Sequence, residues 1–83
     1  MVLKINIKEK VTEKPIQFVL VRIENMTESY VDDTDLYGVA EFKDIRDGKY
    51  NIKIRSKNYR PFTEKMYLSR DSIVNIKLQK AFD

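Results

Sequence analysis

Two short turn signals constrain the fold of this chain more than any other feature. Between Thr34 and Gly38 an Asp and a Gly stand three residues apart, as a type I turn prefers, because Asp35 can accept hydrogen bonds from the backbone ahead of it and Gly38 closes the turn without a steric clash. Asp47-Gly48 lies between Phe42 and Tyr50. An Asp-Gly pair between apolar alternations predicts a tight hairpin in which both turn residues take positive φ. The turns predict an antiparallel β-protein and leave its chemistry open.

Alternating apolar residues around these turns predict seven short strands. We expect them at residues 2–8, 16–23, 29–33, 39–42, 49–55, 62–68 and 74–78. The clearest, 49–55, places Tyr50, Ile52 and Ile54 inward and a cationic ladder outward. The run 16–23 is apolar on both phases, which predicts a strand that is either buried on both faces or central in its sheet. Pro61 places the strand after it at a sheet edge or starts it afresh, because proline cannot donate to a ladder.

Strands spaced about ten residues apart with polar turns predict a seven-stranded antiparallel Greek-key β-sandwich. The competing all-β fold is a five-stranded nucleic-acid-binding barrel, whose strands are longer and are curved by internal glycines or bulges. The chain has two glycines, and both serve the predicted turns. The sandwich is therefore the favoured architecture.

Length and composition indicate one small domain held by apolar contacts. We expect a single domain over residues 1–83. The chain has no cysteine and no histidine, so disulfides, thiolate sites, the usual metal ligand and the usual neutral-pH base are all missing. We expect no cofactor, no small-molecule substrate and no enzymatic activity. No apolar stretch is long enough for a signal peptide or a membrane span, so we expect cytoplasmic synthesis and leave the final compartment open, including a virion or surface assembly.

The net charge of +3 is distributed unevenly. Residues 28–47 carry a net charge of minus five and residues 48–83 carry plus six. Three carboxylates, Asp32, Asp33 and Asp35, lie close together in the acidic segment but lack the regular odd-position spacing of a calcium loop. We interpret them as solvated turn residues, and we expect the acidic and basic ends of the molecule to attract each other.

A longer pattern resembles a known family. It consists of Thr34, Asp35, Gly38, Val39, Ala40, Glu41, Phe42, Asp44, Ile45, Gly48, Lys49, Tyr50, Ile52 and Ile54, with Tyr59 further on. This string is similar to carboxypeptidase regulatory-like and collagen-adhesin B-type domains, and the similarity covers nearly the whole chain. It implies a transthyretin-like sandwich of the kind used in stalks, spacers, adaptors and ligand-binding modules.

The adhesin branch of that family forms an internal isopeptide bond, promoted by a buried glutamate, between a lysine of the first strand and an Asn or Asp of the last. This chain departs from the pattern. Ile54 stands where the glutamate belongs, and Lys4, Lys8 and Asn75 fall on the phase opposite to the core residues. We therefore expect no such bond.

Two groups of exposed residues are candidates for contact with a partner. The first is the basic strand and its continuation, Lys49, Lys53, Arg55, Lys57, Tyr59 and Arg60, which could track a polyanion, although Tyr59 also fits a core or corner position. The second is Leu36 and Tyr37 at the tip of the first turn, where an aromatic side chain has no reason to serve the core.

We predict a non-catalytic structural or protein-interaction module of a larger assembly, such as a cell-surface or phage-particle complex. Protein partners or self-association, with strand addition at a sheet edge, would be the mechanism, and the acidic turn end and cationic strand face would be the docking surfaces. The alternative is a soluble glycan- or polyanion-binding module, which is distinguished by binding that weakens steeply with salt.

Overall fold

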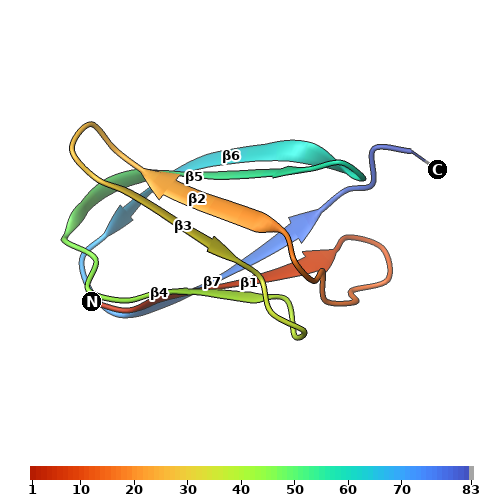
Figure 1. Ribbon diagram of the computed structural model, residues 1–83, viewed down its shortest axis with the longest axis horizontal. Helices are drawn as coiled ribbons and strands as arrows, with labels where there is room; N and C mark the ends of the chain where they lie inside the picture. The colour runs from red at the N-terminus through yellow and green to blue at the C-terminus, as the bar shows by residue number, and fades with distance from the viewer. Residues whose placement is uncertain (83) are drawn as a thin grey trace.

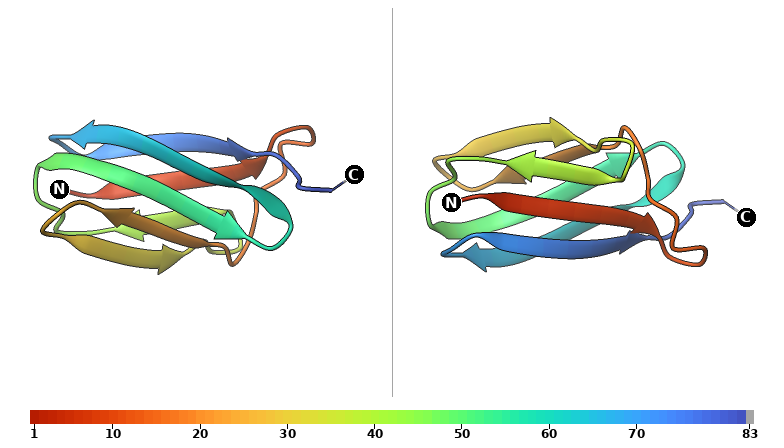
Figure 2. Two further views of the ribbon diagram at one scale, coloured as in Figure 1. Left: turned by 90° about the horizontal axis from the view of Figure 1, so that it is seen from above. Right: turned by 90° about the horizontal axis from the view of Figure 1, so that it is seen from below.

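The computed structural model describes residues 1–82 as two β-sheets stacked face to face (Figures 1 and 2). The strands are β1 (Leu3–Glu9), β2 (Leu20–Glu24), β3 (Ser29–Asp33), β4 (Val39–Phe42), β5 (Gly48–Ser56), β6 (Tyr59–Leu68) and β7 (Ser72–Leu78). One sheet has the order β4-β1-β7 and the other the order β3-β2-β5-β6. The sandwich measures 38 × 22 × 16 Å. No segment of residues 1–82 forms an apolar helix of the length that a membrane crossing needs.

The predicted seven-stranded sandwich is confirmed, with one difference in strand direction. Four of the five ladders within residues 1–82 are antiparallel, but β1 and β7 pair in parallel, from Leu3 opposite Ser72 to Glu9 opposite Leu78. Alternation of apolar residues shows which face of a strand is buried and carries no information on the direction of its neighbour. The parallel pair therefore could not be read from the pattern.

The core lies between the sheets and is built from the alternating residues that the sequence indicated. Ile5 and Ile7 of β1, and Ile52 and Ile54 of β5, are fully buried members of one apolar cluster. Tyr50 is also buried, and its hydroxyl donates a hydrogen bond to the Arg46 carbonyl oxygen at 2.7 Å. Each buried aliphatic side chain contributes about 1.5–3 kcal/mol through removal of apolar surface from water. This core fixes the outward phase of every strand.

Of the two alternatives for residues 16–23, a strand buried on both faces is wrong and a central strand is confirmed. Val21 is buried, but Phe18 is 70% exposed and Leu20 is 45% exposed, and β2 begins only at Leu20. Phe18 has a positive φ of 55°, a backbone conformation that is unusual for a bulky residue and ends the extended run. β2 is nevertheless central, since it lies between β3 and β5.

The first predicted turn is confirmed. The Gly38 amide donates to the Asp35 carbonyl oxygen at 3.0 Å, and Gly38 has a φ of 76°. The Asp35 carboxylate accepts hydrogen bonds from the amides of Tyr37 and Val39. A Cβ atom on Gly38 would lie 2.6 Å from the Ile7 carbonyl oxygen. Glycine is therefore required both by the backbone conformation and by the close approach of β1.

The predicted Asp47-Gly48 hairpin is wrong. β4 pairs with β1 and β5 pairs with β2, so residues 43–47 cross from one sheet to the other instead of joining paired strands. Positive φ values occur at Asp44 (59°) and Gly48 (155°), and Asp47 has none. Ile45 is buried in this crossing, and its side chain helps to draw the segment across the core.

The four-stranded sheet has one hairpin before this crossing, β2–β3, and one after it, β5–β6. β5 ends at Ser56 and β6 begins at Tyr59, three residues before the predicted strand, with a bulge between Ile54 and Ser56. Pro61 lies inside β6, and β6 is an edge strand, as the proline predicted.

Candidate functional site

The outer surface of the four-stranded sheet carries most of the basic strand residues. β5 directs Lys49, Lys53 and Arg55 outward, because Tyr50, Ile52 and Ile54 point into the core. Arg22 of β2 is the direct partner of Lys53, and Lys65 of β6 is the direct partner of Asn51. We call these five residues, Arg22, Lys49, Lys53, Arg55 and Lys65, the cationic face.

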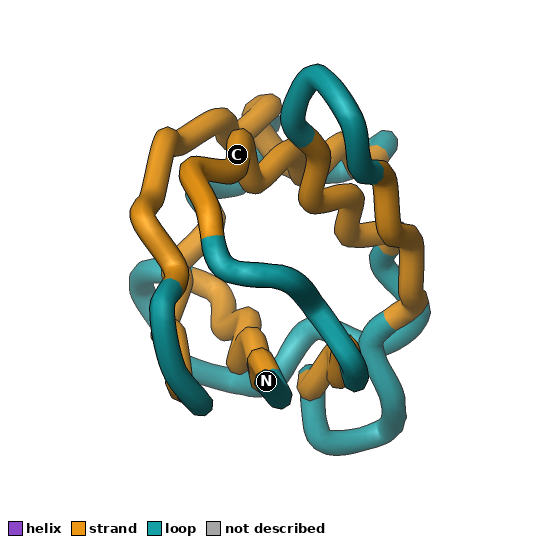
Figure 3. The backbone as a smooth tube through the Cα atoms, turned by 90° about the vertical axis from the view of Figure 1, so that its left-hand side faces the viewer, coloured by secondary structure: helices purple, strands orange, loops and turns teal. Residues whose placement is uncertain are grey.

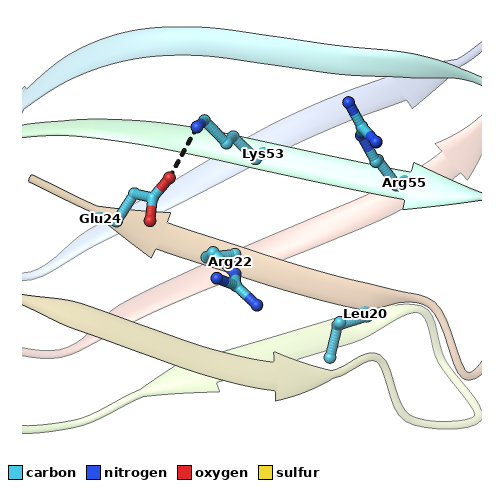
Figure 4. A pocket seen from close by; sticks show the side chains of 5 residues that line it. All are labelled: Leu20, Arg22, Glu24, Lys53 and Arg55. Carbon is cyan, nitrogen blue, oxygen red and sulfur yellow. Dashed lines mark ion pairs between the residues drawn. The ribbon is translucent and has the colours of Figure 1, made fainter.

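A shallow groove of about 310 Å³ crosses this face between β2 and β5. It is lined by Leu20, Arg22, Glu24, Lys53 and Arg55 (Figure 4). Lys53 and Glu24 form an ion pair of 2.7 Å, and the side chains of Arg22 and Arg55 lie apart from this pair. The hydrogen bond from Lys53 holds the pKa of Glu24 below its ordinary value. One cation of the groove is therefore neutralised at neutral pH, and two guanidinium groups remain.

The remaining cations of the face have no acidic partner among the ion pairs of residues 1–82. They are Arg22, Lys49, Arg55 and Lys65. Guanidinium groups bind carboxylates and phosphates with two parallel hydrogen bonds. The arrangement can therefore bind an anionic group, and the paired strands hold the two arginines on a rigid base.

Three further predicted contact residues lie beyond this face. Lys57 is exposed in the turn between β5 and β6, and Arg60 is exposed at the start of β6. Tyr59 is half-buried and packs against the core cluster, the position that its corner interpretation favoured. Its ring is thus partly covered, whereas Lys57 and Arg60 extend the basic surface to the end of the hairpin.

The predicted pair at the first turn is exposed and is joined by an aromatic residue that sequence reasoning missed. Leu36 is 60% exposed, Tyr37 is 79% exposed and Phe18 is 70% exposed. The Phe18 amide donates to the Thr34 carbonyl oxygen at 2.9 Å, which ties the loop that carries Phe18 to the start of the turn. We call Phe18, Leu36 and Tyr37 the end patch.

The acidic side chains of segment 28–47 are distributed over separate loops and strands, and docking through the acidic turn end stays a prediction. Asp32 accepts a hydrogen bond from the Glu41 amide, and Asp35 accepts two within its own turn. Glu28 pairs with Arg46 at 3.7 Å, on a different loop from the Asp35 turn. Within residues 1–82 the acidic side chains form no cluster with the geometry of a metal site. The carboxylates act mainly as local hydrogen-bond acceptors.

Arg22 and Lys65 are members of the cationic face that sequence reasoning did not include. Each lies in a strand whose partner and register had to be known before its side chain could be placed beside β5. The outward phase of Arg22 was readable from Val21 and Ile23 on either side of it. Its position beside Lys53 could not be read from the sequence, because it depends on the register of β2 against β5.

No protein-family model matches the sequence, and none of the curated proteins matches it significantly. Solved structures do match. The Bacillus anthracis TIE protein superimposes with a TM-score of 0.82 at 16% identity, covering 95% of this chain and 16% of that protein. The group B streptococcus pilus 2b backbone protein gives 0.81 at 12% identity, covering 98% of this chain and 41% of that protein. The Klebsiella pneumoniae 5-hydroxyisourate hydrolase gives 0.76 at 15% identity, covering 95% and 90% of the two chains.

These likenesses show that the chain has the transthyretin-like, adhesin B-type β-sandwich fold, as the sequence pattern predicted. The chain spans about a sixth of the TIE protein and about two fifths of the pilus backbone protein. The carboxypeptidase regulatory-like branch of the resemblance stays a prediction. Identities this low concern the fold alone, since one fold carries many unrelated functions.

Proposed function

We propose that the protein is a non-catalytic interaction module, folded as one sandwich over residues 1–83, that docks onto a negatively charged protein surface through the cationic face. Its setting would be a larger assembly such as a cell-surface or phage-particle complex. The observation that carries the proposal is the pair of unpartnered arginines, Arg22 and Arg55, which line one groove beside the neutralised Lys53–Glu24 pair and on the same side of it.

The chemistry of this groove supports protein recognition. Leu20 is 45% exposed at the edge of the groove and supplies an apolar contact beside the guanidinium groups. Arginine is enriched at interface positions that dominate binding energy, and an apolar neighbour excludes water from the ion pairs that form there. A partner with two carboxylates around an apolar residue would match Arg22, Leu20 and Arg55.

Two further observations support a module without catalysis. The sequence has neither histidine nor cysteine, and several carboxylates already accept backbone hydrogen bonds, such as Asp32 and Asp35. The sandwich also matches parts of longer proteins, among them the pilus backbone protein. The end patch would provide a second, apolar contact through Leu36 and Tyr37.

A polyanion-binding role is the second candidate. It is favoured by the continuation of the cationic face through Lys57 and Arg60, which lengthens the basic surface beyond the groove. Binding of this kind depends on counterion release, so its affinity falls steeply with salt. Acidic protein docking depends also on Leu20 and keeps part of its affinity at high salt.

The test uses polyglutamate and heparin as probes of the full chain, titrated by isothermal calorimetry at several salt concentrations. The double variant Arg22→Gln/Arg55→Gln should weaken polyglutamate binding about tenfold, equivalent to about 1.4 kcal/mol. The control Lys10→Gln/Lys14→Gln removes the same charge from exposed residues outside the face. Equal losses in both variants would contradict docking at the face. Heparin binding with a steep salt slope and no polyglutamate binding would establish the polyanion role instead.

A further inference from the structure

The two long sides of the sandwich differ in how they are closed, because one sheet has four strands and the other three. On one side β3 lies over β4, and the Asp32 carboxylate accepts a hydrogen bond from the Glu41 amide across the sheets at 3.0 Å. On the other side β6 has no counterpart in the smaller sheet. β6 and β7 are joined by residues 69–71 at one end and by a bridge between Tyr59 and Lys80 at the other (Figure 2).

The edge of β7 offers unpaired backbone groups on this open side. Successive residues of a strand direct their N–H and C=O groups to opposite edges. The Ser72 amide donates to the Val2 carbonyl oxygen, and the Leu78 carbonyl oxygen accepts from the Lys10 amide. The even-numbered residues of β7 therefore direct their backbone N–H and C=O groups toward β1. Ile73, Asn75 and Lys77 therefore direct their backbone groups away from β1. No second strand pairs with β7 within residues 1–82.

Just beyond β7, the odd-numbered residues do form backbone hydrogen bonds on the side away from β1. Gln79 accepts from the Arg60 amide at 2.9 Å, and the Ala81 amide donates to Asn58 at 3.0 Å. The beginning of β6 thus covers the continuation of this edge and then departs from it into the other sheet. What remains open is the stretch from residue 73 to residue 77.

The other edges carry protection that β7 lacks. β4 has only four residues and is bonded to Asp32, and β3 bears Asp32 and Asp33. β6 contains Pro61, and it places Glu64 on the inward phase, opposite Ile52. Prolines, inward charges and short strands are the devices that prevent pairing with other chains. β7, with the sequence Ser-Ile-Val-Asn-Ile-Lys-Leu, has one lysine and no proline.

Apolar side chains beside this edge are incompletely covered. Phe62 and Met66 of β6 and Val74 of β7 point inward but are only half-buried against the core. A strand added to β7 would extend the smaller sheet to four strands and lie beneath β6. It would form hydrogen bonds with the backbone N–H and C=O groups of residues 73, 75 and 77. It would also cover the side chains of Phe62, Met66 and Val74.

We infer that the open edge of β7 binds one extended segment of a partner protein by strand addition, and this inference rests on the proposed role as an interaction module. The segment has apolar residues on its inward phase, facing Phe62, Met66 and Val74. Glu64 shares this phase between Phe62 and Met66 and is exposed to solvent. The segment has an acidic residue on its outward phase. Lys77 lies beside Lys8 on the outer surface and is paired with Glu13 at 2.9 Å, whereas Lys8 has no acidic partner among the ion pairs of residues 1–82.

The occupant is a single segment and not a second folded copy. β6 lies over the edge of β7 near the end where residues 69–71 join the two strands (Figure 2), so a second sandwich paired through its own β7 would bring its four-stranded sheet against β6. An isolated strand brings no second sheet with it. Figure 3 shows the strands of the two sheets along the long dimension of the molecule. Backbone pairing would give affinity, and the alternating side chains would give selectivity.

The test tethers a probe strand to the full chain. The strand Thr-Val-Glu-Val-Thr-Val-Glu is fused after residue 83 through about eight Gly and Ser residues, a linker with an average reach of about 16 Å. The described chain ends at the same end of the sandwich as β7 (Figure 1). Tethering raises the effective concentration of the strand to the millimolar range. Amide hydrogen exchange is then followed by NMR.

We expect exchange at Ile73, Asn75 and Lys77 to slow at least tenfold, with Val74 unchanged. A fusion that carries the same residues in the order Val-Val-Glu-Thr-Glu-Val-Thr should give no such protection. Ile73→Pro should abolish it and Ile73→Thr should keep it, because only proline removes an outward N–H. Spectra of both variants without the tether establish that each is folded.

Unchanged exchange at these three amides, or protection on β3 or β6 instead, would overturn the inference. Polyglutamate titration of the same fusion separates this outcome from the proposed function. Lost protection with intact polyglutamate binding rejects only the β7 site, and intact protection without polyglutamate binding rejects only docking at the cationic face.

Discussion

The two long sides of this sandwich differ in how the sheets are joined along their edges. On the β3–β4 side, three contacts lock the edge together: Asp32 accepts from the Glu41 amide across the sheets, the Thr34 side chain bonds the loop before β2, and the Gly38 carbonyl oxygen accepts from the Ile7 amide of β1. On the β6–β7 side the sheets meet through backbone at the two ends of the strands. The locked side should therefore determine stability, and the other should determine which partners can add to the fold.

Gly38→Ala should cause the largest loss on the locked side. The new Cβ atom would lie 2.6 Å from the Ile7 carbonyl oxygen, on backbone that also has a φ of 76°. We expect the free energy of unfolding to fall by about 3 kcal/mol or more in urea denaturation. Gly48→Ala is the matched control, since its Cβ would meet nothing closer than 3.7 Å. Equal losses in the two variants would show that backbone conformation, and not the contact with β1, is what matters.

Thr34→Val tests the buried anchor of the same side. The Thr34 hydroxyl donates to the Ile16 carbonyl oxygen at 2.8 Å and accepts from the Val19 amide at 2.9 Å, and the residue is 1% exposed. Valine keeps the shape but leaves two buried backbone groups unsatisfied, so we expect a loss of about 2–3 kcal/mol in thermal or urea unfolding. Thr34→Ser keeps both hydrogen bonds and should cost clearly less. A neutral Thr34→Val variant would mean that the loop does not depend on this anchor.

Asp32→Ala should have a smaller effect. It removes the acceptor for the Glu41 amide, a single and partly exposed hydrogen bond, and we expect a loss of about 1 kcal/mol. The neighbour Asp33 is exposed on the outer phase of the same strand, so Asp33→Ala removes the same charge and should change unfolding by less than about 0.5 kcal/mol. If the two substitutions lower the free energy of unfolding equally, the loss of charge, and not of the contact between the sheets, explains the effect.

A pH titration gives the smallest effect and concerns the loop beside β7. The Glu9 carboxylate accepts hydrogen bonds from the Val11 and Thr12 amides, and chiefly the Val11 bond lowers the pKa of Glu9. A lowered folded-state pKa contributes stability above pH 4.5, and this is lost as the pH falls through the folded value. Glu9→Gln should flatten that part of the acid unfolding curve. The Thr34 anchor is a neutral hydroxyl, so Thr34→Val should leave the shape of the curve unchanged.

The sequence was sufficient for the number of strands and the bounds of several of them, and insufficient for their arrangement. β4 was predicted with its bounds, and β5 within one residue at each end, because apolar alternation and nearby turn residues mark them directly. The pairing of β4 with β1, where a hairpin with β5 was expected, depends on the path of residues 43–47 across the core. Local turn chemistry does not specify such a path.

The candidate site was predictable within a single strand but not across neighbouring strands. Lys49, Lys53 and Arg55 follow from the phase of one strand, whereas Arg22 becomes their neighbour only through the register of β2 against β5. The exposure of Phe18 depends on hydrogen bonds between residues 16–19 and Thr34. A hydrophobic run with no breaker gave no sign of them, since the bonds join segments that are distant in sequence.

The parallel pairing of β1 with β7 has a mechanical consequence. Both strands run in the same direction along the long dimension of the molecule (Figure 1). Tension applied at the start of β1 and the end of β7 would pull the two strands past one another lengthwise. The hydrogen bonds between Leu3–Glu9 of β1 and Ser72–Leu78 of β7 would then be loaded together in shear and would not open one after another. A domain placed in line within a stretched filament would resist extension through this single ladder.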